Sequence, residues 1–449
     1  MATNVILTVD LGFGDAGKGT VTDYLTRATG AHTVVRYNGG AQAAHRVVTP
    51  DGREHVFAQF GAGALAGAAT FLSRFMLLEP LAMLEEERHL RELGLPDPLA
   101  SAAIDERALL ITPFARALNR LRELARGDAR HGSCGIGVGE TVDLALAYPD
   151  QAPRAGDMAR PAALAAKLKF LRQRALERLA ALRPALPDSP AAAAEIDLLT
   201  DPDLIDWLLE AYAGFARRVT LAGPEHLGRL LGRGGTVIFE GAQGVLLDEW
   251  RGFHPHTTWS TTTLENADTL LAEAGFSGSV RRIGITRAYA TRHGAGPLVS
   301  ECAALTAALP DPRNGDNPWQ CGFRVGWLDL VLLRYARAAV GHLDELAVTC
   351  LDRLSALPDL QVCASYTRAA GPRESDTVIE RLPLSADPRD LDHQARLTAT
   401  LAECAPRLER LDGPGELLAR LADELGAPVT LTSWGPRATD KRAGERALR

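Results

Sequence analysis

The first forty residues alternate between strand, glycine loop and helix, and this pattern restricts the fold more than any other part of the sequence. Val5–Val9 is a short apolar, largely β-branched run that ends at Asp10, and the loop LGFGDAGKG follows it directly. Residues 20–30, TVTDYLTRATG, have the length of a helix with Gly30 as its stop signal. A second strand pattern, HTVVRY, occupies residues 32–37. This order predicts an α/β fold.

The rest of the chain supplies more strands and a helical segment. Between about 155 and 233 the composition changes to Ala, Leu and Arg, with leucines at helical spacing. We therefore expect one domain over residues 1–449, with a large, mostly parallel central sheet flanked by helices, a P-loop-like architecture and a helical insertion. Five apolar runs predict further strands of that sheet: TVIFEGAQG (236–244), RRIGITRAYATRHGAG (281–296), ELAVTCLD (345–352), LQVCASY (360–366) and PVTLTSWGP (428–436).

Composition argues against several classes of protein. The 49 basic and 56 acidic residues give a net charge of -7, and no basic run predicts a nucleic-acid or membrane surface. The six cysteines lack the spacing of a zinc site or a disulfide framework. The N-terminus has no signal-peptide pattern, and no apolar stretch is long enough to span a membrane. We expect a cytoplasmic protein that binds small anions and has no nucleic-acid or membrane partner.

The loop at residues 11–20, LGFGDAGKGT, departs from a P-loop at two points. Gly12, Gly17 and Lys18 match the P-loop, but Gly19 stands where the magnesium-binding hydroxyl belongs. An acid, Asp15, also lies among N–H groups that suit phosphate. Asp15 could ligate Mg²⁺ or accept a proton while Lys18 and the glycine amides hold a transferring phosphoryl group. A surface loop that resembles a P-loop by chance is the alternative.

His45 ends a second polar loop, RYNGGAQAAHR, which follows the second strand. A histidine there could protonate an oxygen or stabilise charge in transit, although a loop histidine is more often an ordinary hydrogen-bonded residue. The two loops together are more specific than either alone. Both should leave the carboxyl ends of neighbouring strands, where open α/β sheets bind ligands, and so face one another.

An ordered set of motifs resembles the adenylosuccinate synthetase family almost end to end. The family motifs G-D-E-G-K-G-K and R-Y-x-G-G-H-N-A-G-H are similar to the two loops. The resemblance implies a C–N ligase that uses Mg²⁺ and GTP (or ATP) to phosphorylate the 6-oxygen of a purine nucleotide. The amine of an amino acid, typically aspartate, then displaces the phosphate, which leaves more readily than a carbonyl oxygen. Further similar stretches are FEGAQGVLLD (239–248), TRHGAGP (291–297), GWLD (326–329), TCLD (349–352) and SWGP (433–436).

The resemblance also implies a role for each matching residue, and a homodimer as the assembly. Asp15 binds Mg²⁺ and takes a proton from the purine, His45 stabilises charge on the γ-phosphate, and Lys18 contacts phosphates. The backbone carbonyl of Ala44 is a second metal ligand. The other matching residues are expected to bind nucleotides: Gly14, Gly17, Gly19, Thr20, Gln42, Ser133, Gln243, Thr258, Arg324, Asp352, Ser433 and Gly435.

Some positions depart from the family pattern. Ala16 and Ala41 replace a glutamate and a histidine beside the catalytic pair. Cys350 replaces a lysine that packs on guanine, which predicts a weaker preference for GTP over ATP. The arginine that the family sends to the partner's nucleotide has no clear counterpart, and Arg154 is one candidate.

The segment at residues 314–324 also departs from the pattern, because Arg324 stands alone where the family has several arginines. One arginine can hold one carboxylate of aspartate. We therefore expect a raised KM for aspartate or a donor with less negative charge. The alternative is that Arg324 only pairs with Asp329 to brace its loop. Unless Arg287, Arg292 or another distant arginine reaches the site, the second carboxylate of aspartate would lie against Trp319, Gln320 and Phe323, where its desolvation is poorly offset.

Two other functions stay open at this point. One is a diverged enzyme of specialised metabolism that uses a modified nucleotide or another amine. The other is a nucleotide-binding regulator without turnover. The joint presence of Asp15, Lys18 and His45 argues against the regulator, because binding alone needs no proton acceptor beside a stabiliser of the γ-phosphate.

Overall fold

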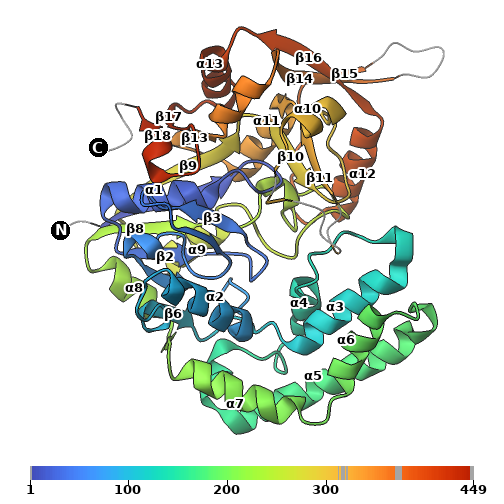
Figure 1. The fold of residues 1–449 in the computed structure, drawn as a ribbon. Coiled ribbons are helices and arrows are strands. Elements are labelled where there is room, and N and C mark those ends of the chain that lie inside the picture. Colours follow the sequence, from blue (N-terminus) through green and yellow to red (C-terminus); the bar gives the residue numbers. More distant parts are fainter. Residues whose placement is uncertain (1–2, 312, 315–318, 320–321, 370–376, 445–449) are drawn as a thin grey trace.

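A ten-stranded sheet forms the centre of the molecule in the computed structural model, which describes residues 3–311, 313–314, 319, 322–369 and 377–444 (Figure 1). Its strand order is β18-β17-β13-β9-β1-β8-β2-β5-β6-β7, and every neighbouring pair is parallel except β17 and β18. The expected α/β class is confirmed. The strands are β1 (Thr3–Asp10), β2 (Thr33–Arg36), β5 (Ala69–Leu72), β6 (Ala102–Asp105), β7 (Thr220–Ala222), β8 (Gly235–Glu240), β9 (Ser279–Arg287), β13 (Glu345–Thr349), β17 (Val429–Ser433) and β18 (Lys441–Ala443).

The sheet is covered on both faces, which explains why its strands are almost continuously apolar. On one face Ile6 of β1 packs with Val21 and Leu25 of helix α1 (Lys18–Thr29). Val5, Leu7 and Val9 of β1 point to the opposite face and join a larger core, since side chains alternate along a strand. The helices of that core include α8 (His226–Leu231), α9 (Glu265–Glu273), α11 (Leu330–Val340) and α13 (Pro414–Leu425).

The strands that precede the two polar loops are not neighbours. β8 lies between β1 and β2 and pairs with both, through Val5↔Val237 and Val34↔Ile238. Our expectation of neighbouring strands was therefore wrong. A strand that arrives so much later in the chain leaves no trace in the local sequence. The two loops still meet, because the first turn of α1 packs against His45.

Two predicted strands lie outside the central sheet. The run LQVCASY becomes β14 (Leu360–Arg368), which pairs with β12 (Leu328–Asp329), β15 (Thr377–Ile379) and β16 (Cys404–Leu411). The end of RRIGITRAYATRHGAG becomes β10 (Ala290–His293), which pairs with β11 (Phe323–Gly326). The expectation of one sheet was wrong for both, because an apolar run indicates burial but not the sheet that buries it. The remaining elements here are the hairpin of β3 (His45–Val48) and β4 (Glu54–Phe57), α10 (Ala303–Ala308) and α12 (Leu391–Ala402).

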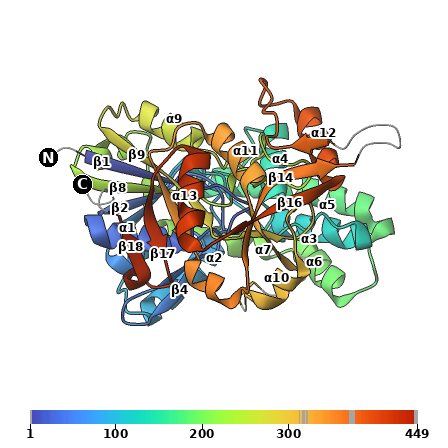
Figure 2. The ribbon, with the colours of Figure 1, turned by 90° about the horizontal axis from the view of Figure 1, so that it is seen from above.

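Helices α3 to α7 form a lobe at the end of the molecule away from the two chain termini (Figures 1 and 2). The leucines whose spacing predicted a helix, Leu164, Leu168, Leu171 and Leu179, are all buried in α5. The stretch expected at about 155–233 is part of this longer helical region, and its last part carries β7 and α8. Among the described residues, no helix is both long and apolar enough to cross a bilayer. The helices of the lobe are α3 (Pro113–Arg126), α4 (Val138–Ala147), α5 (Pro161–Leu182), α6 (Pro190–Thr200) and α7 (Leu204–Ala216), and α7 contacts the neighbouring helix α2 (Pro80–Glu92).

Candidate active site

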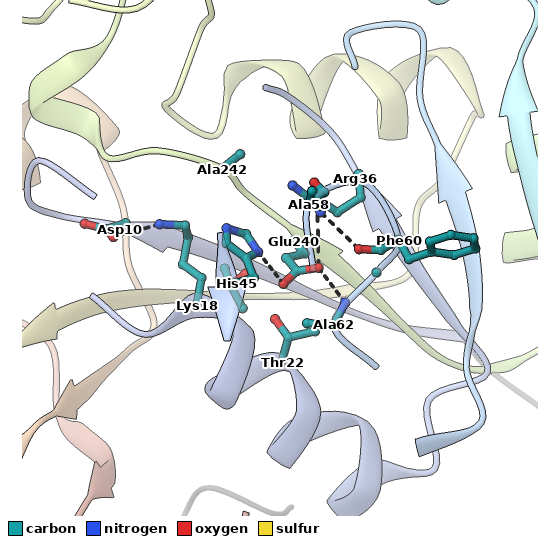
Figure 3. Close-up of polar contacts among 12 residues, drawn as sticks. Asp10, Lys18, Thr22, Arg36, His45, Ala58, Phe60, Ala62, Glu240 and Ala242 are labelled. Atoms are coloured by element: carbon teal, nitrogen blue, oxygen red, sulfur yellow. Dashed lines mark hydrogen bonds and ion pairs between the residues drawn. The ribbon is translucent and has the colours of Figure 1, made fainter. Parts of the chain in front are cut away.

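Asp10, the last residue of β1, closes the glycine loop. Its carboxylate accepts hydrogen bonds from the backbone N–H groups of Gly12 and Ala16, both at 2.9 Å, and pairs with Nζ of Lys18 at 2.8 Å (Figure 3). The Lys18 side chain is only 3% exposed. This ion pair holds the loop against the first turn of α1, where free N–H groups and the helix dipole favour a phosphate.

The glycines of the loop allow an unusually close approach of α1 to β3. Gly14 and Gly17 have φ angles of 94° and 89°, which only glycine adopts at little cost. At Gly19 a Cβ atom would lie 2.8 Å from the backbone carbonyl carbon of His45. The glycine that replaces the P-loop hydroxyl therefore brings the start of α1, with Lys18, next to His45.

Glu240, the last residue of β8, holds the His45 imidazole. Nδ1 of His45 lies 2.8 Å from Oε1 of Glu240, whose Oε2 accepts the N–H of Ala62 at 3.0 Å (Figure 3). Burial, together with the positive charges of Arg36 and Lys18, lowers the pKa of His45 to about 4 against the attraction of Glu240. The ring is thus neutral near pH 7, and it donates its Nδ1 proton to the carboxylate, which leaves Nε2 as the other nitrogen for a ligand.

Arg36, the last residue of β2, balances the charge of Glu240. The guanidinium is fully buried and its Nε lies 3.9 Å from Oε2 of Glu240. Its Nη1 donates to the carbonyls of Ala58 and Phe60, both at 3.1 Å (Figure 3). Burial alone would raise the pKa of the Glu240 carboxyl, but His45 and Arg36 hold it below its ordinary value. Glu240 is therefore an anion, which a buried site tolerates only with such partners.

Asp15 lies in the same loop in a left-handed conformation, with a φ of 60° that is uncommon outside glycine. Its carboxylate is 3.3 Å from Nε2 of His293, and its carbonyl accepts a hydrogen bond from Nε of Arg287 at 2.5 Å. Burial alone would raise the pKa of Asp15, but the His293 hydrogen bond and the charges of Arg287, His293 and Lys18 hold it at about 2. The carboxylate is ionised at physiological pH.

Gln42 and Gln243 lie beside the glycine pair of the second loop. A Cβ at Gly39 would lie 3.1 Å from Oε1 of Gln243, and one at Gly40 would lie 2.7 Å from Oε1 of Gln42. Oε1 of Gln243 and both amide atoms of Gln42 are buried without a hydrogen-bond partner among the described residues. Because buried amides are normally paired, these groups suit a polar ligand.

Thr20, Ser433, Gly435 and Asp352 form a second group, at the ends of β13 and β17. The Thr20 hydroxyl donates to the carbonyl of Pro436 at 2.7 Å, and that of Ser433 donates to the carbonyl of Gly435 at 3.0 Å. Asp352 lies in the short helix η7 (Leu351–Ala356) and lines a cleft of about 580 Å³. A cleft of that volume is large enough for a nucleobase.

Ser133, Thr258 and Arg154 have local partners. The Ser133 hydroxyl, in the loop before α4, donates to Oδ1 of Asn119 at 2.8 Å. The N–H of Thr258 donates to the carbonyl of Leu247 at 2.8 Å. Arg154 donates to the carbonyl of Arg107 at 2.7 Å within its own chain.

Arg324 braces a turn, but with other partners than expected. Its guanidinium pairs with Glu301 at 2.6 Å and donates to the carbonyls of Gly294 and Gly296 at 2.7 and 2.8 Å. The alternative pairing with Asp329 is wrong, because the Asp329 carboxylate caps α11 and accepts the hydroxyl of Tyr366. Of the three residues expected around the second carboxylate, Gln320 lies outside the described residues, Trp319 packs beside Gly135, and Phe323 packs on His293.

Sequence reasoning gave no role to Asp10, Arg36 or Glu240, nor to Lys441, whose ammonium donates to the hydroxyl of Thr20, and it did not pair His293 with Asp15. A signal was present for three of them. Asp10, Arg36 and Glu240 are each the charged last residue of an apolar strand of the central sheet. Charged residues at the carboxyl ends of buried parallel strands lie at the edge where such sheets bind ligands.

Comparisons with known proteins agree with this arrangement. The family model described as adenylosuccinate synthetase matches residues 7–441. The adenylosuccinate synthetase of Clostridium beijerinckii is 30% identical over 450 residues, which cover 95% of each chain. That of Chlorobium chlorochromatii is 34% identical over 365 residues, which cover 79% of this chain and 78% of the relative.

Two solved structures share the fold. The fully ligated adenylosuccinate synthetase from Plasmodium falciparum has a TM-score of 0.79 at 18% identity, with 98% of this chain and 100% of that chain covered. The succinoaminodeoxyadenylate synthetase of cyanophage S-2L, bound to dGMP and dATP, has a TM-score of 0.60 at 17% identity, with 99% and 96% covered. The family model and the relatives over nearly the whole length establish that this chain belongs to the adenylosuccinate synthetase family of C–N ligases.

Proposed function

We propose that this ligase phosphorylates the 6-oxygen of a purine nucleotide that resembles IMP and replaces it with the amine of L-aspartate, which gives adenylosuccinate or an analogue. GTP is the proposed phosphoryl donor. One observation carries the proposal: the ionised carboxylate of Asp15, the buried ammonium of Lys18 and the imidazole of His45 all lie at the glycine loop before α1. A homodimer and a cytoplasmic location stay predictions.

The proposed reaction has two steps. Asp15 accepts the proton on N1 of the purine, and the 6-oxygen attacks the γ-phosphorus, so that the bond to the bridging oxygen breaks and the nucleoside diphosphate leaves. The amine then attacks carbon 6, inorganic phosphate leaves with the former 6-oxygen, and the nitrogen loses a proton. Covalent activation thus replaces one difficult substitution by two easier ones.

Lys18 and His45 act on the phosphoryl group in this proposal. Lys18 supplies a positive charge beside the N–H groups of the glycine loop, where charge develops during transfer. His45 contacts the same group through Nε2, because Nδ1 is bound to Glu240 at 2.8 Å. Glu240 therefore fixes the orientation and the tautomer of the ring.

Asp15 also fits a magnesium site that substrate phosphates complete. Among the described residues, no group of three or more His, Cys, Asp or Glu side chains could hold a metal ion on its own. Mg²⁺ commonly takes one or two protein carboxylates together with phosphate oxygens and water. The ionised carboxylate of Asp15 and the carbonyl of Ala44 would hold the ion, which when bound neutralises charge on the phosphates.

One assay tests the proposed function. The protein is incubated with IMP, GTP, Mg²⁺ and aspartate, each component is then exchanged in turn, and the products are identified by mass. We expect the succinylated nucleotide, GDP and phosphate in equal amounts. Hydrolysis of GTP without a C–N product, or no turnover with any purine nucleotide, would contradict the proposal.

A further inference from the structure

Lys441, the first residue of β18, joins the second group of the site to the phosphate loop. Its ammonium donates to the carbonyls of Gly435 and Arg437, both at 2.9 Å, and to the hydroxyl of Thr20 in the first turn of α1. The Thr20 hydroxyl in turn donates to the carbonyl of Pro436. All three ammonium protons are used, and the turn after β17 is fastened to α1.

The hairpin of β17 and β18 sets this position. Lys441 pairs directly opposite Ser433, and it is 8% exposed. The short helix η8 (Ala438–Asp440) between the two strands packs against α1, and Figure 1 shows β17 and β18 beside that helix. The backbone itself therefore delivers the ammonium to the start of α1.

The use of lysine here is selective. The chain has four lysines, Lys18, Lys167, Lys169 and Lys441, and otherwise relies on arginine for positive charge. The two lysines that are buried, Lys18 and Lys441, both lie beside the first turn of α1. A compact ammonium fits three converging acceptors, whereas a planar guanidinium does not.

Lys441 also lies near position 350, where the family motif has a lysine and this chain has a cysteine. Val348 of β13 pairs with Thr432 of β17, and Ser433 of β17 pairs with Lys441, so Lys441 and the end of β13, after which Cys350 follows, lie on either side of β17 at one edge of the sheet. Burial lowers the pKa of Lys441 to about 8, and the negative charges of Asp440, Asp23 and Asp352 act in the opposite direction. Cys350 stands where the family motif has a lysine, and Asp352 lines the cleft of about 580 Å³. The ammonium is therefore an electrostatic neighbour of the position that lost its own.

We propose that Lys441 is a positioning residue for the base of the nucleoside triphosphate, and that it supplies from β18 the positive charge that position 350 lacks. The inference rests on the proposed function, in which the group around Asp352 receives that base. A carboxylate accepts from the N1 and 2-amino groups of guanine, and a positive charge nearby attracts the 6-carbonyl oxygen. Adenine offers an amino group at that place, so Lys441 favours a guanine nucleotide.

The test uses Lys441→Met together with a rescue variant, Cys350→Lys/Lys441→Met. Binding of GTP and ATP is measured without the other substrates, and KM, kcat and the thermal midpoint are measured in the complete reaction. We expect Lys441→Met to weaken GTP binding and raise its KM by about tenfold or more, with kcat changed by less than about threefold. The ratio of GTP to ATP affinity falls, and the double variant regains most of it.

Two further variants complete the test. Lys169→Met removes an exposed lysine of α5 and is expected to change nothing. Lys441→Gln keeps two hydrogen-bond donors but no charge, so it reports on the charge even if the methionine variant does not fold. We expect it to fold and to lose GTP affinity as the methionine variant does.

Three results would overturn the inference. The first is equal GTP affinity in the wild type, Lys441→Met and Lys441→Gln. The second is an equal loss for GTP and ATP that Cys350→Lys does not restore, which would make Lys441 a brace of the hairpin only. The third is an unchanged ratio of GTP to ATP affinity. The binding measurements need no second substrate, so a wild type that binds GTP but does not ligate IMP would sink the proposed function and leave this inference standing.

Discussion

The proposed phosphate end and the proposed base end of the site are built in different ways. At the phosphate end Asp10, Lys18, His45 and Glu240 form two buried contacts of 2.8 Å each, and they lie at or beside the ends of central strands. At the base end the lysine of the family motif is absent, and Lys441 reaches the region from another strand.

The difference follows from what each end must do. Groups that act on a transferring phosphoryl group must be held within a fraction of an ångström, so their places on the sheet cannot be exchanged. A base needs complementary charge, and charge acts over a longer distance. We therefore expect that the base end can take its lysine from β18, whereas the residues of the phosphate end keep their places on the strands and at the start of α1.

The strongest test of the phosphate end is loss of the reacting groups. We expect Asp15→Asn and His45→Ala each to lower kcat by about a hundredfold or more, because both act on charge that exists mainly in the transition state. Nucleotide binding, measured by calorimetry, should largely persist. Turnover close to that of the wild type in either variant would show that the mechanism proposed here is wrong.

Glu240→Gln tests whether the phosphate end depends on residues behind the reacting groups. The amide can still accept from His45 but carries no charge, so we expect kcat to fall by about tenfold to a hundredfold while the KM for GTP changes little. The imidazole nitrogens, followed by NMR, should lose the fixed Nδ1–H tautomer. Glu225→Gln, at an exposed glutamate before α8, is the matched control.

An unchanged kcat together with an unchanged tautomer in Glu240→Gln would mean that the contact is structural only. A loss of thermal stability is expected in either case, because Arg36 would keep its buried charge without the opposite one. Stability alone therefore does not separate the two roles, and the tautomer does.

Much of the fold could be predicted, because local patterns carry it. The run Val5–Val9, the glycine loop and Gly30 gave β1, the loop and the end of α1 almost to the residue. Leucine spacing gave α5. Strand neighbours and sheet membership could not be predicted, since pairing of β8 with β1 and β2, and of β14 with β16, depends on contacts between distant segments.

The candidate site shows the same division. Asp15, Lys18 and His45 were proposed from the sequence because their loops have recognisable motifs. Glu240 and Lys441 were not, because their importance comes from the hydrogen bonds to His45 and Thr20, which only the folded chain creates. Arg324 was also proposed from the sequence, but its pairing with Glu301 depends on the antiparallel pairing of β10 with β11, which the sequence did not predict.

The region around Arg324, where we expect the amine donor to bind, is a third part of the site, and we expect an effect of intermediate size on the KM for the donor. Arg324 already binds Glu301 and two carbonyls, so it can hold at most one carboxylate of aspartate. We expect a KM for aspartate about tenfold or more above that of the Clostridium beijerinckii relative, or a preference for a less charged donor, since each charge-assisted hydrogen bond contributes about 1.5–3 kcal/mol. Competition between aspartate and neutral amino acids, read by mass, decides it.

Arg324→Ala is the companion experiment for the donor. We expect it to raise the KM for the preferred donor further and to abolish most of the remaining activity. Tight and exclusive use of aspartate that survives Arg324→Ala would remove this arginine from the donor site and leave it as a brace of its turn.

The smallest expected effect concerns the stability of the base end. Burial lowers the pKa of Lys441 from 10.5 to about 8, against the negative charges of Asp440, Asp23 and Asp352. Between these two pKa values the unfolded chain binds more protons at this amine than the folded protein does, so the free energy of unfolding rises with pH in that window. The cost of burying the charge is fully present below about pH 8 and is relieved as pH approaches 10.

The variant Lys441→Met lacks this titration. From pH 8 to pH 10 we expect the wild type to gain on the order of 2 kcal/mol in urea unfolding relative to Lys441→Met. A difference that stays constant with pH would mean that the ammonium of Lys441 keeps its ordinary pKa in the folded protein, so that its burial costs no free energy.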